Sequence, residues 1–233
     1  MLLVQFLQPL RRRRDGHREI DNQGQMNHAR PFAARAKDPA LEVQAVVLVF
    51  HKPYGVLSQY KPVAGKRTLL EFPGLSGGTA VGRLDEDSEG LLVISDMAWV
   101  QTLLTRPGQI EKTYHAQVER VPDGQALERL RQGVRCGDFV SAPASARLLP
   151  DLHMPEREPP IRHRLSVPTC WLELRLREGK NRQVRRMTAA VGHPTLRLLR
   201  VSVGELQLGQ LPAGESRPLT SSEQAWLTRI GKR

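Results

Sequence analysis

Residues 82–96 read GRLDEDSEGLLVISD, and this stretch decides how the chain is interpreted. Its first nine residues contain four acids, one arginine and two glycines, although the whole chain carries a formal net charge of +11. The apolar run after Gly90 is too short for anything but a buried strand. An acidic cluster in a basic protein either balances nearby cations or performs chemistry, and the rest of the sequence bears on that choice.

The composition favours a globular protein with an anionic partner. A chain of 233 residues supports one or two domains with a sizeable core. Its 35 Lys and Arg residues outnumber 24 Asp and Glu residues, which indicates nucleic acid before membrane as the partner. A generically basic protein is the plainer alternative. No apolar run approaches about 18 residues, so we expect no membrane span.

The cysteines and histidines indicate neither a disulfide framework nor a metal site. Cys136 and Cys170 are far apart in the chain, which favours a reducing compartment and therefore a cytoplasmic location. The seven histidines show no HxxxH spacing, and no CxxC pair occurs. We expect no bound metal.

The pattern along the chain predicts an α+β fold with a largely antiparallel sheet. Residues 1–44 lack periodicity and include four consecutive arginines, so they read as a flexible basic tail. Order is expected from residue 45 onward, with a Pro-rich surface loop at 150–168. The predicted strands are 45–50, 91–94, 112–119 and 172–177, with one or two more in 195–208. The predicted helices are 97–105, 123–132, 182–191 and 222–230.

The helix at 182–191 is the second signal. Asn181 is its expected N-cap, and its apolar positions share one face (Val184, Met187, Thr188 and Val191). Three arginines, Arg182, Arg185 and Arg186, occupy the first turns, where the positive end of the helix dipole disfavours cations. Their place is explained if an anion lies among them, either a phosphate or an internal carboxylate such as Asp85. A solvated arginine face is the alternative.

Two other interpretations of residues 82–96 stay open on spacing alone. From Asp85 onward the string resembles an EF-hand calcium loop, but position 12 is Asp96 instead of glutamate and the glycine-rich segment before it cannot form the entering helix. Alternatively, Asp85 caps a turn before a buried strand and has no chemical role.

Four motifs in order resemble one family. Gly-Arg-Leu-Asp-x-x-Ser-x-Gly-Leu-Leu resembles the catalytic motif of RNA pseudouridine synthases, specifically the RsuA branch that includes small-subunit ribosomal RNA enzymes. The other three motifs are FHKPYGV at 50–56, KTY at 112–114 and EGKNRQVRRM at 178–187. The resemblance covers about residues 45–210. The Pro-rich segment EPPIR at 158–162, followed by Pro168, Thr169 and Trp171, is most similar to a type that acts on large-subunit ribosomal RNA.

The resemblance implies the family's catalytic fold: a long, curved, mainly antiparallel sheet with flanking helices and a central basic cleft. Residues 45–233 would form this catalytic domain, as two subdomains around the cleft. Many relatives carry an S4-type RNA-binding domain before it, and here the unpatterned residues 1–44 stand in its place, so no S4 domain is expected.

The resemblance also implies a catalytic set. Asp85 matches the catalytic aspartate, Arg185 the arginine that pairs with it, and Tyr114 the active-site tyrosine that packs on the base. Whether Asp85 attacks the sugar or the base is left open. Arg83 matches a residue that fills the space of the flipped base, and its alternative role is a phosphate contact. We assign Lys180, Arg182 and Arg186 to RNA backbone contact. The three remaining acids, Glu86, Asp87 and Glu89, are expected to be solvated bystanders.

The function implied is isomerisation of a uridine in ribosomal RNA to pseudouridine, without a cofactor, by a monomer. Large-subunit RNA is the expected substrate, with small-subunit ribosomal RNA or tRNA as alternatives. A non-catalytic RNA-binding protein on the same fold is the competing class.

Overall fold

A computed structural model of the protein describes residues 47–75, 77–161, 164 and 166–232. The described residues all belong to one compact unit. The predicted tail of residues 1–44 and its boundary lie outside the described residues, so that part of the domain prediction stays a prediction.

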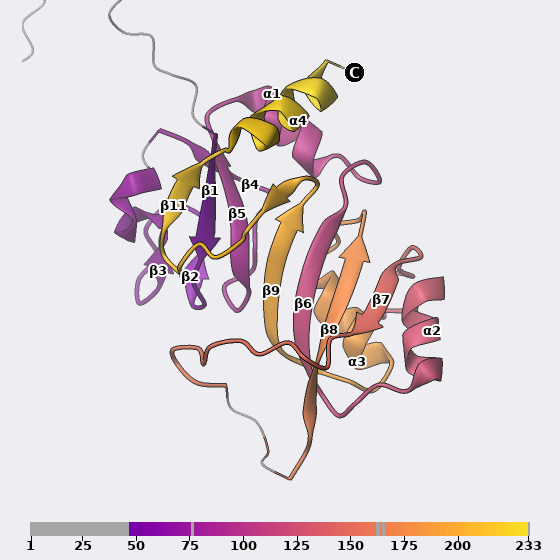
Figure 1. Cartoon of the computed structure of the whole chain (residues 1–233). Coiled ribbons are helices and arrows are strands. Elements are labelled where there is room, and N and C mark those ends of the chain that lie inside the picture. Colours follow the sequence, from indigo (N-terminus) through magenta and orange to yellow (C-terminus); the bar gives the residue numbers. More distant parts are fainter. Residues whose placement is uncertain (1–46, 76, 162–163, 165, 233) are drawn as a thin grey trace, which may run out of the picture. The chain divides into compact units, whose positions relative to one another are not determined.

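A nine-stranded sheet is the centre of this unit, in the order β11-β1-β5-β9-β6-β8-β7, with β4 paired to β5 and β10 paired to β9 (Figure 1). The strands are β1 (Val47–Lys52), β4 (Thr79–Val81), β5 (Glu89–Ser95), β6 (Lys112–Glu119), β7 (Ser145–Leu148), β8 (Thr169–Leu176), β9 (Thr195–Val203), β10 (Leu206–Gln207) and β11 (Ser216–Pro218). Two short strands, β2 (Val56–Leu57) and β3 (Arg67–Thr68), pair separately.

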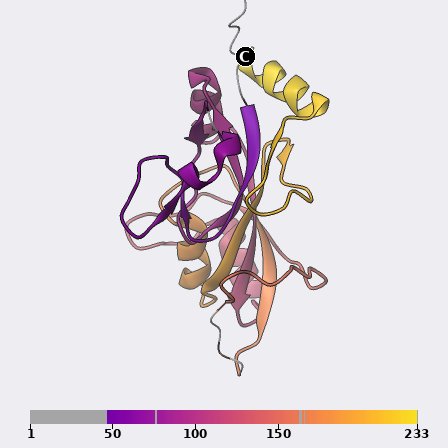
Figure 2. The same cartoon turned by 90° about the vertical axis from the view of Figure 1, so that its left-hand side faces the viewer.

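The sheet is mainly antiparallel, because every neighbouring pair in it runs antiparallel except β5 and β9. Its long strands bend and twist, as Figures 1 and 2 show. The predicted α+β class, the curved sheet and the flanking helices are therefore confirmed. The strand predicted at 172–177 is also confirmed, and Leu172, Leu174 and Leu176 are buried along β8.

The parallel contact between β5 and β9 joins two halves of the sheet. It consists of the pairs Glu89–Leu199 and Gly90–Arg200, whereas β6 pairs with β8 over eight positions. The first half holds β11, β1, β5 and β4, and the second holds β9, β6, β8 and β7. The hydrophobic cluster around Val93 extends from β5 to Leu199 and Val203 of β9, whereas the cluster around Leu172 lies in the second half. The loop that precedes β5 thus lies where the halves meet.

Four α-helices flank the sheet: α1 (Ala98–Thr105), α2 (Gly124–Gln132), α3 (Gln183–Ala190) and α4 (Ser221–Gly231). Two short 3-10 helices, η1 (Leu69–Glu71) and η2 (Pro73–Leu75), follow β3. Helix α1 contacts α4, α2 contacts β7, and α3 contacts β9. The predicted helices are confirmed to within a few residues. No helix in these ranges has the length and apolar character needed to cross a membrane.

Helix α3 begins differently from the prediction. Its N-cap is Arg182, in a left-handed conformation with φ of 49°, and not Asn181. A non-glycine residue in this region is strained, and such strain is retained where the surroundings fix it. Here the Arg182 side chain is held by a carboxylate from the loop before β5. The apolar face of α3 is buried as predicted.

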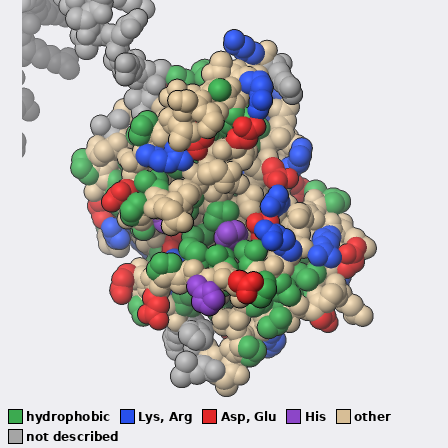
Figure 3. Space-filling view, viewed as in Figure 1, with side chains coloured by type: hydrophobic (Ala, Val, Ile, Leu, Met, Phe, Trp, Pro, Cys, Tyr) green, Lys and Arg blue, Asp and Glu red, His purple; other side chains and the backbone are tan. Residues whose placement is uncertain are grey.

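The face of the sheet opposite α3 is shown in Figure 3, where acidic and basic side chains lie among apolar ones. The described part of the Pro-rich segment crosses this face as a loop without strands or helices, as predicted (Figure 2). The Pro155 carbonyl accepts a hydrogen bond from Arg197 on β9, at 2.7 Å. The Arg157 guanidinium lies 3.7 Å from the ring centroid of Tyr54 in the first half.

Candidate functional site

The site is built around residues 82–88, here called loop 82–88, between β4 and β5. The backbone of Leu84 is fixed by Ser58, whose hydroxyl donates to the Leu84 carbonyl at 2.7 Å and accepts from the Leu84 amide at 3.1 Å. A turn closes the loop, because the Ser88 amide donates to the Asp85 carbonyl at 3.1 Å. Asp85 therefore projects from a fixed backbone.

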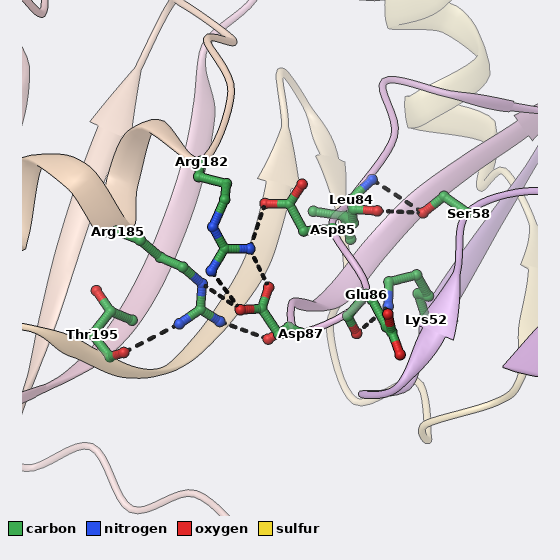
Figure 4. A network of polar contacts seen from close by, with 9 residues as sticks. All are labelled: Lys52, Ser58, Leu84, Asp85, Glu86, Asp87, Arg182, Arg185 and Thr195. Atoms are coloured by element: carbon green, nitrogen blue, oxygen red, sulfur yellow. Dashed lines mark hydrogen bonds and ion pairs between the residues drawn. The ribbon is translucent and has the colours of Figure 1, made fainter. Parts of the chain in front are cut away.

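Lys52 supports loop 82–88 from below. Its buried ammonium donates to the carbonyls of Pro53 and Val56, at 2.8 and 2.7 Å. It also donates to the Glu86 carbonyl at 3.4 Å, the contact drawn in Figure 4. Burial lowers the pKa of Lys52 to about 8, against the opposing influence of nearby carboxylates, Glu89 first among them. Lys52, which belongs to the FHKPYGV motif at 50–56, therefore holds the backbone of that motif against the backbone of loop 82–88.

A buried ion pair and a buried arginine fix the loop to the second half of the sheet. Arg197 donates to both oxygens of Glu89, at 3.0 and 2.9 Å, and both side chains are less than a tenth exposed. Arg200 donates to the carbonyls of Gly82 and Leu91, at 2.7 and 2.8 Å. The prediction that Glu89 is a solvated bystander was wrong, because Glu89 neutralises an arginine from β9 inside the protein.

A cavity of about 420 Å³ opens beside loop 82–88. The loop supplies Asp85 to its wall, β6 supplies Tyr114, and the segment before α3 supplies further residues. Its basic lining residues are Arg83, Lys112, Lys180, Arg182 and Arg200, against the acids Asp85 and Glu178. The predicted basic cleft is therefore present.

Arginines from α3 reach the acids of loop 82–88 (Figure 4). Arg182 donates to the two carboxylate oxygens of Asp87, at 3.0 and 2.6 Å, and its Nη1 lies 3.7 Å from Asp85 Oδ2. Arg185 donates to the Asp87 carbonyl at 2.6 Å and to the Thr195 carbonyl at 3.1 Å. Its Nε lies 3.4 Å from Asp87 Oδ2.

This arrangement differs from the expected direct pair of Asp85 with Arg185. The ion pair of Asp85 in the described chain is with Arg182, and Arg185 is held one step away by Asp87. The positive charge of Arg185 still acts on the site, since Asp85 is among the acids that influence its pKa. Asp87 is thus not the solvated bystander predicted from sequence, because it organises both arginines next to Asp85.

The ionisation of this cluster follows from burial and charge. Burial alone would raise the pKa of Asp87, but hydrogen bonds from Arg182 and the charge of Arg185 outweigh it and hold the pKa below its ordinary value. Burial lowers the pKa of Arg185, although Asp87 and Asp85 oppose that effect. The hydrogen bonds to Asp87 raise the pKa of Arg182. The two arginines thus favour the charged form of Asp87.

Tyr114 lies on β6 opposite Leu174 of β8 and is partly buried against the cluster of the second half. Tyr114 lines the same cavity as Asp85. Lys112, two residues before Tyr114, lines this cavity too. The strand alternation places both side chains on the cavity side of β6. The structure therefore brings Asp85 and Tyr114 to one cavity, from opposite halves of the sheet.

The four residues assigned to RNA contact have different surroundings. Arg83 is exposed at the cavity wall, and within the described ranges its side chain has no hydrogen bond or ion pair. Lys180 is exposed and contacts Val140 and Glu178. Arg186 is held by Asp138 and by the Cys136 carbonyl, with its guanidinium 4.4 Å from the Phe139 ring centroid. Arg83 is thus the most available of the four.

Sequence reasoning missed four residues of this site: Lys52, Asp87, Lys112 and Arg200. Lys52 lies in the motif FHKPYGV and Lys112 in the motif KTY, and this place in a family motif could have indicated a role in the site. Asp87 lies two residues after Asp85, but no pattern separated it from its acidic neighbours. Arg200 lies with Arg197 in a strand that is otherwise largely apolar, and arginines in such a strand signal burial with partners.

The calcium-loop interpretation does not fit the geometry. Strand β4 precedes loop 82–88 and strand β5 follows it, whereas an EF-hand requires a helix on each side. Across the described residues, no three or more His, Cys, Asp or Glu side chains gather as metal ligands do.

Comparisons with known proteins all match this chain to proteins of one family. The family model described as RNA pseudouridylate synthase matches residues 46–190. The chain is 49% identical to ribosomal large subunit pseudouridine synthase E of Xanthomonas axonopodis pv. citri, over 71% of this chain and 90% of that one. It is 44% identical to the protein of the same name from Vibrio parahaemolyticus, over 77% and 76%. A crystal structure titled pseudouridylate synthase matches with a TM-score of 0.64 and 25% identity, over 80% of this chain and 74% of that chain.

Proposed function

The chain belongs to the RNA pseudouridylate synthase family, and we propose that it converts one uridine of large-subunit ribosomal RNA to pseudouridine, with Asp85 as the catalytic carboxylate. The substrate class is supported by the names of the relatives that are 44% and 49% identical to it. One observation carries the assignment of Asp85. Its carboxylate lies at the wall of a basic cavity, facing arginines, on a loop fixed from three sides.

The reaction is an isomerisation that needs no external reagent. The bond from uracil N1 to ribose C1′ breaks, the uracil turns, and a bond from C5 to C1′ forms. The proton of C5 leaves and N1 gains one, so atoms and electrons balance. The target base has to leave its stack first, which costs a few kcal/mol and least in a loop or bulge.

Each predicted residue has a role in this scheme. Asp85 is the nucleophile, towards either ribose C1′ or the base. Tyr114 packs its ring on the uracil and serves as the base that removes the C5 proton. Arg185 compensates the acids of loop 82–88 from α3. Arg83, Lys180 and Arg182 contact the RNA at the cavity wall, and Arg186 contacts the RNA backbone outside it. Arg83 fills the space that the flipped base leaves, or else contacts a phosphate.

We expect the protein to act as a monomer in the cytoplasm. Asp85 and Tyr114 line one cavity, and Arg185 of the same chain binds the loop that carries Asp85, so no second copy is needed to complete the site. Its substrate, ribosomal RNA, is a cytoplasmic molecule in bacteria such as those that supply the named relatives.

The alternatives differ in substrate or in chemistry. Small-subunit ribosomal RNA and tRNA would suit the same cavity, and the names of the relatives favour the large subunit. A non-catalytic RNA-binding protein would also bind RNA with a steep salt dependence, because that dependence reports only phosphate contacts. Only product formation separates catalysis from binding.

The test maps pseudouridine in ribosomal RNA from a strain that lacks the gene. We expect one large-subunit uridine to lose its modification, and a plasmid with the wild-type gene to restore it. Asp85→Asn should not restore it, whereas Glu71→Gln, which alters an exposed ion pair with Arg67, should. An unchanged large-subunit map would contradict the substrate, and restoration by Asp85→Asn would contradict the role of Asp85.

A further inference from the structure

Lys112 is a buried cation at the cavity that the scheme above does not use. Lys112 is only 6% exposed, and it lines the same cavity as Asp85 and Tyr114. Its ammonium donates one hydrogen bond, to the Ile110 carbonyl at 3.1 Å. Among the described residues it forms no ion pair with a carboxylate. An ammonium carries three donors, so most of its hydrogen-bonding capacity is free to face the cavity.

The other deeply buried cations of the site are better satisfied. Lys52 donates to three carbonyls, Arg197 to both oxygens of Glu89, and Arg200 to two carbonyls. Burying an ammonium without a partner is costly. Burial, and then the positive charge of Arg200, lower the pKa of Lys112, so the surrounding protein disfavours its charge. A cost of this kind is retained at a binding or catalytic site when a ligand supplies the missing partner.

The place of Lys112 indicates which part of a nucleotide it meets. In the proposed scheme the RNA phosphates meet the exposed cations of the cavity wall, Arg83, Lys180 and Arg182. Lys112 is buried and lies two positions from Tyr114 on the same side of β6, where the base packs. From this position the ammonium can reach an oxygen of the uracil ring. A phosphate at the cavity mouth is out of its reach.

We propose that Lys112 is a further catalytic residue, whose ammonium donates a hydrogen bond to a carbonyl oxygen of the target uracil and stabilises the negative charge that the ring takes on during isomerisation. The inference rests on the proposed function. When the N1–C1′ bond breaks, its electron pair stays on the ring and spreads to the carbonyl oxygens. Addition of Asp85 to the ring would place charge on the same oxygens. The pair is returned when C5 bonds to C1′, and Lys112 keeps its proton throughout.

The test compares Lys112→Met, Lys112→Arg and the control Lys61→Met, an exposed lysine outside the cavity. The substrate is an RNA fragment containing the mapped uridine. We expect Lys112→Met to lower the single-turnover rate at saturating RNA by about 10²-fold, as for loss of one donor to a developing charge, with little change in RNA affinity. Lys112→Arg should retain more activity than Lys112→Met, and Lys61→Met should match the wild type.

A second substrate separates charge stabilisation from a structural role. With 5-fluorouridine at the target position, fluorine withdraws electrons and the ring carries negative charge with less help. The ratio of wild-type to Lys112→Met rates, followed as disappearance of the starting nucleoside after digestion, should be several times smaller than with uridine. An equal ratio on both RNAs would show a structural role and overturn the proposal.

Two further outcomes would also overturn it. One is an unchanged rate at saturating RNA for Lys112→Met. The other is weaker RNA binding with a salt slope reduced by about one and the rate retained, which is the signature of a phosphate contact. If the wild type itself forms no product on any mapped RNA, the proposed function has failed instead.

Discussion

Loop 82–88 is held by two sets of charged residues that differ in exposure. The buried support comprises Lys52, Glu89, Arg197 and Arg200, all less than a tenth exposed. The open face comprises Asp85, Asp87, Arg182 and Arg185, whose side chains are 12% to 43% exposed.

Both sets join acids of one motif to basic residues far along the chain. Buried ion pairs are costly to break, whereas exposed ones contribute little stability. The buried support therefore fixes the geometry, and the open face is free to exchange partners with a substrate.

The largest effect on stability is expected from Glu89→Ala. It leaves Arg197 buried without its carboxylate, and such an uncompensated charge costs about 3–5 kcal/mol. The free energy of unfolding in urea measures this. The double variant Glu89→Ala with Arg197→Met should recover a large part of the loss, because both charges are then absent. A loss of unfolding free energy below about 1 kcal/mol for Glu89→Ala would show that the buried ion pair of Glu89 with Arg197 does not stabilise the fold.

Gly90→Ala should be nearly as damaging. Gly90 has φ of 102°, and a Cβ there would lie 2.4 Å from the Arg200 carbonyl oxygen and 2.8 Å from its amide nitrogen. Both atoms are backbone, so β5 and β9 would have to separate, at about 2–4 kcal/mol. Gly108→Ala is the matched control, with φ of 78° and open space around the new Cβ. Equal losses for the two variants would show that backbone strain, and not the narrow junction, is responsible.

The pH dependence of stability tests Lys52. Its pKa is about 8 in the folded protein and 10.5 when unperturbed, so the unfolded chain binds more protons in that window and stability rises with pH there. Between about pH 7 and about pH 9 the wild type should gain about 1 kcal/mol relative to Lys52→Met. Urea unfolding at both pH values measures the difference. A wild type that loses stability relative to Lys52→Met over this range would contradict the assignment.

The smallest effect on stability, with a large effect on activity, is expected from Asp87→Asn. Its ion pairs are partly exposed, so the unfolding free energy should change by less than about 1 kcal/mol. The pseudouridine-forming rate should fall about tenfold or more, because Arg182 and Arg185 lose the carboxylate that holds them beside Asp85. Glu86→Gln, which alters an exposed pair with Lys66, is the control and should leave both quantities near wild type. A wild-type rate for Asp87→Asn would contradict the claim that Asp87 positions the two arginines beside Asp85.

The sequence predicted the fold well because hydrophobic periodicity reports burial directly. The strands at 112–119 and 172–177 and the helix at 182–191 carry one apolar face each, and these faces form the core. Motif order predicted which segments meet at the cavity. The acids of residues 85–89 could not be sorted by pattern, because their partners, Arg182, Arg185 and Arg197, lie about a hundred residues away.

The detailed pairing at the site also depended on geometry that spacing does not encode. Asp87 and not Asp85 receives Arg185, and Arg182 begins α3 in a left-handed conformation. Lys112 stood in the quoted motif KTY beside Tyr114. Only its burial, and the lack of a carboxylate partner in the described chain, distinguish it from an ordinary strand lysine.

The rate of pseudouridine formation by purified Asp85→Asn tests the division between the two sets most directly. The measurement is a single turnover at saturating RNA, with the unfolding free energy determined on the same preparation. We predict a rate at least about 10³-fold below wild type, with RNA still bound and stability within about 0.5 kcal/mol of wild type. A rate within about tenfold of wild type would contradict the central claim that Asp85 performs the chemistry.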